Sequence, residues 1–258
     1  MDNISRNITQ TSNTDIEKTY KIIQWENELN LKPFNILSKL DRYRRIKSNE
    51  TSWYVYLKKG NCRERSLIFE QMANKTNLTY RRLEIDGYID PNHFQTSNHR
   101  WNEVWLDGDW RIADSGFSLY YPKNNNSYFT LERGILIGHV AVLNARGEYI
   151  GDRTNSYVNN SGKLIIIAKK DNDYIGSADI SIKLKYKNIT SNVIGENLKV
   201  HTNETGFYEM NLGIFNDTYY IVNVSSGDLF EEKNVTIFNE KTNVLIMDLD
   251  NSSIPVKS

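Results

Sequence analysis

The apolar pattern of this chain changes near Asn160, and this change limits the possible folds more than any other feature. Before it, helical spacings of apolar residues alternate with strand-like runs. From about residue 161 to 250 the chain contains only short strand patterns separated by polar turns. Six or seven short strands at this spacing are typical of a β-sandwich. We therefore predict an α+β fold, in which N-terminal helices and an antiparallel sheet are followed by an all-β sandwich domain.

The same pattern predicts four segments. We expect a flexible N-terminus over residues 1–13, a mixed α+β domain over 14–160, a β-sandwich domain over 161–250 and a flexible tail over 251–258. A length of 258 residues permits one large domain or two modest ones. Because 39% of the residues are hydrophobic, a packed core is expected.

Cys62 is the only cysteine, so the chain forms no internal disulfide and no thiolate-rich zinc site. The turn Gly60-Asn61 precedes it, and the apolar-periodic helix pattern of residues 62–75 follows. The amides at the start of a helix favour a thiolate over a thiol. Cys62 is therefore a candidate nucleophile.

His99 and Asp114 lie on two strand patterns that are joined by Asp107-Gly108. This pair suits a two-residue hairpin turn of type I′. In that register Trp105 faces Trp110, and His99 and Asp114 lie on the same face of the sheet, diagonal to each other. An aspartate in this position can hydrogen-bond to the imidazole and fix its orientation.

Cys62, His99 and Asp114 together contain the groups that an activated thiol needs: a nucleophile, a base and a carboxylate that orients the base. Separately, a cysteine is more often an apolar filler and a strand histidine more often a structural residue. The combination favours a cysteine-dependent amide hydrolase that works through a thioester. Transfer of the acyl group to an amine, and a non-catalytic surface-binding or structural protein, are the alternatives. No metal site or cofactor site is predicted.

These residues resemble the transglutaminase-like superfamily, which shares the Cys-His-Asp arrangement of papain-like enzymes. The resemblance rests on Gly60-Asn61-Cys62, on the His-x-Trp-x-Glu pattern that begins at His99, and on the Gly-x-Trp-x-x-x-Asp pattern that ends at Asp114. It implies Cys62 as nucleophile, His99 as general base and acid, and Asp114 as the residue that orients His99. Ser115 follows Asp114, where this family often has proline.

The β-rich region is similar to carboxypeptidase regulatory-like, or transthyretin-like, domains, through residues 200–208 and 217–224. Such domains usually stabilise or dock and do not carry out the chemistry.

Four further residues are candidates for substrate binding, with structural packing as the alternative for each: Trp53, Tyr56, Trp101 and Glu103. The expected partner is a protein or peptide substrate, with cell-wall peptides and glycopeptides among the possibilities. Because Lys+Arg and Asp+Glu balance at 32 each, a nucleic-acid partner is not expected. No apolar run is long enough for a membrane span.

Thirteen Asn-x-Ser/Thr sequons occur in the chain, whereas its composition would give about four or five by chance. This excess favours a glycosylated protein that is extracellular or at the cell surface, with a cytoplasmic location as the alternative. The first residues have neither a basic n-region nor an apolar h-region. We therefore expect that a leader or upstream region is missing from this sequence.

Overall fold

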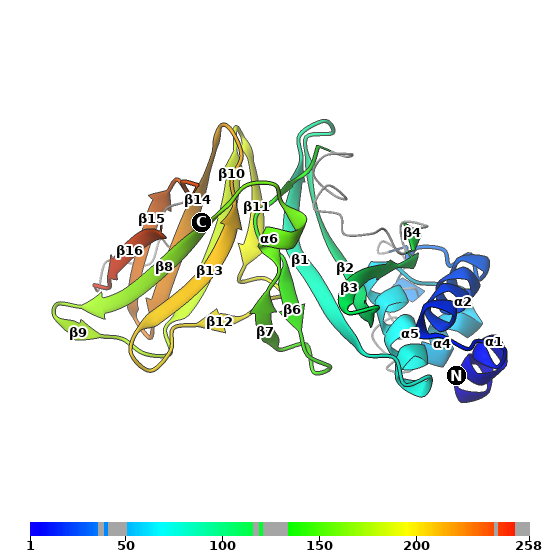
Figure 1. The fold of residues 1–258 in the computed structure, drawn as a ribbon. Helices are drawn as coiled ribbons and strands as arrows, with labels where there is room; N and C mark the ends of the chain where they lie inside the picture. The colour runs from blue at the N-terminus through cyan, green and yellow to red at the C-terminus, as the bar shows by residue number, and fades with distance from the viewer. Residues whose placement is uncertain (36–38, 41–50, 116–118, 121–133, 240–241, 251–258) are drawn as a thin grey trace. The chain divides into compact units, whose positions relative to one another are not determined.

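A computed structural model describes residues 1–35, 39–40, 51–115, 119–120, 134–239 and 242–250. It contains N-terminal helices, antiparallel sheets and a large C-terminal all-β region, so the chain has the predicted α+β fold (Figure 1). Its contacts divide it into two compact units. Unit 1 comprises residues 1–83 and 99–124, and unit 2 comprises residues 84–98 and 125–258.

Unit 1 contains four helices within the described residues: α1 (Asp2–Thr9), α2 (Asp15–Glu28), α4 (Thr51–Leu57) and α5 (Cys62–Lys75). Helix α2 begins after Thr14, whose side-chain oxygen accepts a hydrogen bond from the backbone N–H of Glu17 at 3.1 Å. Buried apolar side chains of α2, α5 and two strands form one core, listed here: Ile22, Ile23, Ile68, Phe69, Met72, Val104, Leu106 and Ala113.

Helix α1 lies where the sequence predicted a flexible N-terminus. Short polar helices depend on tertiary contacts that a local sequence pattern does not show. Ile4 and Ile8, four residues apart, pack against the helical core of unit 1. The hydroxyl of Thr9 also donates to the carbonyl of Ser5 at 2.8 Å. The predicted flexible tail over 251–258 lies outside the described residues.

The first sheet has the strand order β4-β3-β2-β1-β6-β7, and β5 also pairs with β1. Its strands are β1 (Tyr80–Asp90), β2 (Gln95–Leu106), β3 (Asp109–Asp114), β4 (Leu119–Tyr120), β5 (Leu136–Ile137), β6 (Ala141–Leu143) and β7 (Tyr149–Asp152). Strands β2 and β3 are antiparallel, with Trp105 opposite Trp110 and Glu103 opposite Ile112. The hairpin register that the sequence predicted is confirmed.

Unit 2 contains two further sheets and the short helix α6 (Thr154–Tyr157). One sheet has the order β11-β10-β14-β15, with β12 on β10, and the other has the order β13-β8-β16, with β9 on β8. The strands are β8 (Ser161–Lys170), β9 (Asp173–Tyr174), β10 (Asp179–Tyr186), β11 (Ile189–Ile194), β12 (Val200–His201), β13 (Phe207–Gly213), β14 (Thr218–Ser226), β15 (Leu229–Val235) and β16 (Thr242–Asp248).

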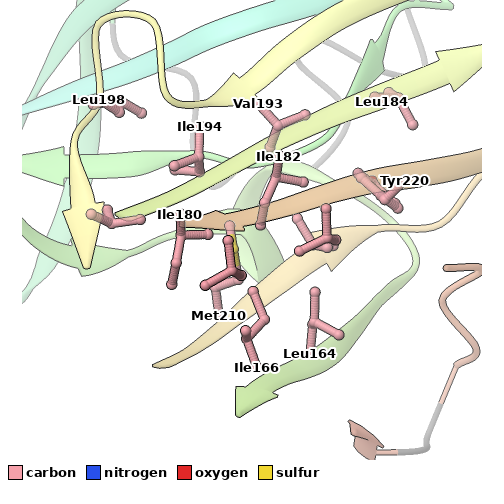
Figure 2. Close-up of a cluster of buried hydrophobic side chains, with 14 of the residues drawn as sticks. Leu164, Ile166, Ile180, Ile182, Leu184, Val193, Ile194, Leu198, Met210 and Tyr220 are labelled. Atoms are coloured by element: carbon pink, nitrogen blue, oxygen red, sulfur yellow. The ribbon is translucent and has the colours of Figure 1, made fainter. Parts of the chain in front are cut away.

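The core of unit 2 lies between these two sheets. Figure 2 shows Leu164, Ile166 and Met210 from one sheet pointing towards Ile182 and Tyr220 from the other. Alternate residues of β8 and β10 are buried, as a sheet with one apolar face requires. The packing is that of a β-sandwich.

The boundaries of units 1 and 2 differ from the predicted domain boundary at residue 160. Ile89 of β1, together with Ala141 and Leu143 of β6, belongs to the same buried cluster as the sandwich strands. These residues bring part of the first sheet into unit 2. No helix in the described part of the chain is both long enough and apolar enough to span a membrane.

Asp86 of β1 is buried in unit 2 and binds the loop between β11 and β12. Its carboxylate accepts hydrogen bonds from the backbone N–H groups of Glu196 at 3.1 Å and Asn197 at 2.9 Å. The side-chain amide of Asn197 donates to it at 2.6 Å. A single carboxylate therefore satisfies several backbone and side-chain donors of this loop.

Replacement of Asp86 by alanine should lower the free energy of unfolding by about 2–4 kcal/mol, because the amides of this loop then lose a charged acceptor. Urea unfolding followed by circular dichroism measures this change. The control is Asp179→Ala, which removes an exposed carboxylate from β10 of the same unit and should change stability by less than about 0.5 kcal/mol. Equal stability of the two variants would contradict this role of Asp86.

Candidate active site

Helix α5 begins at Cys62 because the chain just before it is anchored. The backbone N–H of Asn61 donates to the Glu64 carboxylate at 2.9 Å, which caps the first turn. A Cβ atom on Gly60 would lie 3.1 Å from the Glu64 Cβ and 3.2 Å from Leu31 Cδ1, so a larger residue would require these side chains to shift by a few tenths of an ångström. The Cys62 thiol is therefore fixed at a helix N-terminus, where the helix dipole favours a negative charge.

A buried polar cluster joins α5 to strands β1 and β2. Arg82 donates to the Glu70 carboxylate at 2.6 Å, and the Asn102 side-chain amide donates to the same group at 3.1 Å. The hydroxyl of Ser66 on the helix also donates to it, at 3.1 Å. Because each hydrogen bond is directional, this cluster fixes the helix against the strand that carries His99.

His99 of β2 and Asp114 of β3 form a buried pair. The His99 Nε2 atom lies 2.7 Å from the Asp114 Oδ2 atom. The two side chains are 5% and 4% exposed. The His99 ring is stacked on Trp101, with ring centroids 5.5 Å apart and an interplanar angle of 12°. Asp114 and Trp101 together fix the position and the tilt of the imidazole.

The sulfur of Cys62 is half-buried and interacts with His99. Burial alone would raise the pKa of the thiol. The hydrogen bond and the charge of His99, with a hydrogen bond from the backbone N–H of Arg100, outweigh burial and lower the pKa of Cys62 below its ordinary value. Because Asp114 occupies Nε2 of His99, Nδ1 is the ring nitrogen left to interact with Cys62.

For His99, nearby groups favour the charged, protonated ring in spite of its burial. Burial would lower the pKa of the imidazolium, but the charge and hydrogen bond of Asp114, together with Cys62, raise this pKa to about 9. The lowered pKa of the thiol and the raised pKa of the imidazole both favour a thiolate–imidazolium pair. This pair is the reactive form of a cysteine nucleophile.

The other predicted site residues lie in different environments. Trp101 and Glu103 are buried, and Glu103 forms an ion pair with Arg81. Their exposed fractions are 1% and 2%, which favours a packing role for both side chains. Trp53 and Tyr56 are stacked on each other on helix α4, with ring centroids 5.4 Å apart. Tyr56 is 77% exposed, so this pair has an open aromatic surface.

Glu26 and Ser115 were not among the predicted site residues. Their side chains are hydrogen-bonded to each other and line one crevice together with Asp114 and Arg65. A signal for Glu26 was present in the sequence, because it follows Ile22 by four residues and thus occupies the apolar face of its helix. Within the described residues, no group of three or more His, Cys, Asp or Glu side chains could hold a metal ion.

Comparison with known proteins places this geometry in a family context. Residues 2–115, which carry all three candidate residues, match the model of the transglutaminase-like superfamily. Within this chain, residues 2–115 are therefore similar to a transglutaminase-like domain. A comparison with curated proteins found no match.

Among solved structures, the chain is similar to a candidate cysteine protease from Cytophaga hutchinsonii, with 13% identity, a TM-score of 0.35, and coverage of 55% of this chain and 47% of that one. It is similar to a candidate protease from Parabacteroides distasonis, with 15% identity, a TM-score of 0.37, and coverage of 70% and 32%. It is also similar to the minor pilin GBS52 from Streptococcus agalactiae, with 10% identity, a TM-score of 0.28, and coverage of 70% and 86%.

The chain aligns with about half of the first of these proteins and a third of the second.

Replacement of Asp114 by asparagine should lower the pKa of His99 from about 9 by at least about one pH unit. Asp114 stabilises the imidazolium through its charge and hydrogen bond, and asparagine removes that charge. The shift can be followed by NMR titration of the histidine ring nitrogens. Asp109→Asn, on the same strand β3, is the matched control, and its His99 should titrate as in the wild type. An unchanged pKa in Asp114→Asn would rule out this role.

Proposed function

We propose that this protein is a cysteine-dependent hydrolase of amide bonds, with Cys62 as nucleophile, His99 as general acid and base, and Asp114 as the residue that orients His99. The observation that carries the proposal is the buried His99–Asp114 hydrogen bond of 2.7 Å beside a thiol whose pKa is lowered by His99. The transglutaminase-like match over residues 2–115 supports a papain-like cysteine enzyme in general.

The first half of the proposed reaction forms a thioester. The Cys62 thiolate attacks the carbonyl carbon of the amide and forms the C–S bond. The backbone N–H of Cys62, at the first position of α5, donates to the oxygen that becomes negative. His99 then gives its proton to the nitrogen, the C–N bond breaks, and the amine leaves.

In the second half, His99 is neutral and accepts a proton from water. The resulting hydroxide attacks the thioester carbon, the C–S bond breaks, and the carboxylic acid leaves. Cys62 is again a thiolate and His99 again an imidazolium, so the cycle is closed. Asp114 stays ionised and keeps the ring oriented throughout.

The substrate in this proposal is a protein or peptide. The exposed pair Trp53 and Tyr56 lies on α4, which packs against α5, the helix that begins with Cys62. Stacked, exposed aromatic rings bind apolar or ring-shaped groups well, so we assign this pair to substrate contact. Such a contact would act on KM more than on kcat.

The proposal also covers the role of the β-sandwich and the location of the protein. The β-sandwich of unit 2 is a carboxypeptidase regulatory-like module that stabilises or docks the enzyme. The site of action is extracellular or at the cell surface, on the basis of the excess of sequons.

The Cys62→Ala variant should lose hydrolysis entirely, since no other thiol is present to form the thioester. The assay incubates the protein with fluorescein-labelled casein and dansylcadaverine. Release of small labelled peptides reports hydrolysis, and attachment of dansylcadaverine to casein reports acyl transfer to an amine. Equal hydrolysis by wild type and Cys62→Ala would refute the assignment of the nucleophile.

The same assay separates the alternatives. Attachment of dansylcadaverine without release of peptides would make the protein an acyltransferase with the same nucleophile. A non-catalytic binding protein would show neither product, and its Cys62 would react with iodoacetamide no faster than an ordinary thiol at pH 6.

The rate of hydrolysis should fall on the alkaline side with a midpoint near pH 9. The imidazolium of His99 must give a proton to the leaving amine, and it loses this proton as the pH rises through its pKa of about 9. On the acid side the rate should fall as the Cys62 thiolate becomes protonated. A pH–rate profile of kcat/KM measures both limbs. A rate that continues to rise above pH 10 would contradict the role of His99 as an acid.

A further inference from the structure

Glu26 is a carboxyl group buried in helix α2 that the proposed mechanism does not use. Its side chain is only 1% exposed. One oxygen, Oε2, is hydrogen-bonded to the hydroxyl of Ser115, and the other, Oε1, is buried with no hydrogen-bond partner among the described residues. A buried polar atom without a partner destabilises a fold. A leucine here would fill similar space without that loss, so packing alone does not call for a carboxyl group.

Glu26 is linked to the candidate active site through Ser115 and Asp114. Ser115 directly follows Asp114, and it therefore continues the strand end that carries the carboxylate facing His99. Glu26, Asp114 and Ser115 line one crevice. The contact between Glu26 and Ser115 joins residues 89 positions apart in the chain. It ties β3 to helix α2 at the end where Asp114 lies.

The charge of Glu26 affects Asp114 because the two carboxyl groups line the same crevice. Burial raises the pKa of Glu26 to about 8, and the nearby charge of Asp114 acts in the same direction, while the Ser115 hydrogen bond and the charge of Arg65 act against them. At neutral pH most Glu26 side chains therefore carry a proton and no charge. A neutral group can hold Ser115 without adding a second negative charge beside Asp114.

We propose that Glu26 is a positioning residue for the catalytic pair: through Ser115 it holds the end of β3 so that the Asp114 carboxylate stays on Nε2 of His99. This inference rests on the proposed function, in which the Asp114–His99 hydrogen bond keeps the imidazolium in place. The effect of Glu26 on chemistry passes through Ser115 and Asp114.

The test is the pKa of His99, measured by NMR titration of the ring nitrogens in the folded protein. Glu26→Leu removes the hydrogen bond to Ser115 but keeps the side chain apolar and buried. This variant should lower the pKa of His99 from about 9 by about one pH unit and slow the alkylation of Cys62 by iodoacetamide at pH 6 by about tenfold. Glu26→Gln, which is neutral and can still bond to Ser115, should restore both values.

Two further variants make the result specific. Ser115→Ala removes the other half of the contact and should shift the pKa of His99 in the same direction as Glu26→Leu. It also replaces that variant if Glu26→Leu does not fold. Glu28→Leu, an exposed position on the same helix, is the matched control and should leave the pKa of His99 unchanged.

The outcomes separate this inference from the proposed function. If Ser115→Ala and Glu26→Leu are folded and both keep a His99 pKa near 9, Glu26 has only a structural role and the inference is overturned. The inference stands if both variants lower this pKa, even when the casein assay shows no hydrolysis. In that case the proposed function alone fails.

Discussion

The hydrogen bond between His99 and Asp114 is the interaction on which the candidate active site depends. It joins two neighbouring strands within a single hairpin, and both side chains are shielded from water. Because the local dielectric is low, the carboxylate acts strongly on the imidazole. The raised pKa of His99 follows from this hydrogen bond, and the lowered pKa of Cys62 follows in turn from His99. Without Asp114, the main effect that opposes burial of the charged imidazolium would be lost.

Local signals were sufficient to predict the hairpin that carries this pair. Asp107 and Gly108 both have positive φ angles, of 52° and 80°, which a type I′ turn requires and which the Asp-Gly pair favours. Once the turn is fixed, the alternation of side chains determines which residues share a face. The sequence could not predict that β16 pairs with β8 in parallel. The two strands are far apart in the chain, and no local pattern records which strand will be the neighbour.

The candidate site residues likewise include some that the sequence could predict and some that it could not. Cys62, His99 and Asp114 could be found because each lies in a short motif whose chemistry is recognisable in sequence. Glu26 could not be assigned to Ser115 because the contact joins distant parts of the chain. The burial of Glu103 could not be predicted either, because a charged residue on a strand is expected to face solvent unless a partner is known. That partner, Arg81, lies on the neighbouring strand β1.

Each of the three catalytic candidates is held by a different polar anchor. The bond from Asn61 to Glu64 fixes the turn before Cys62, the Glu70–Arg82–Asn102 cluster fixes helix α5 against β2, and Glu26 fixes Ser115 beside Asp114. Apolar packing tolerates small slips between elements, whereas hydrogen bonds weaken steeply with distance and angle. Such hydrogen bonds align the sulfur, the imidazole and the carboxylate more precisely than apolar contacts alone would. Among the described residues the Oε1 oxygen of Glu26 has no hydrogen-bond partner, and in our proposal the stability lost there is offset by the alignment of Asp114.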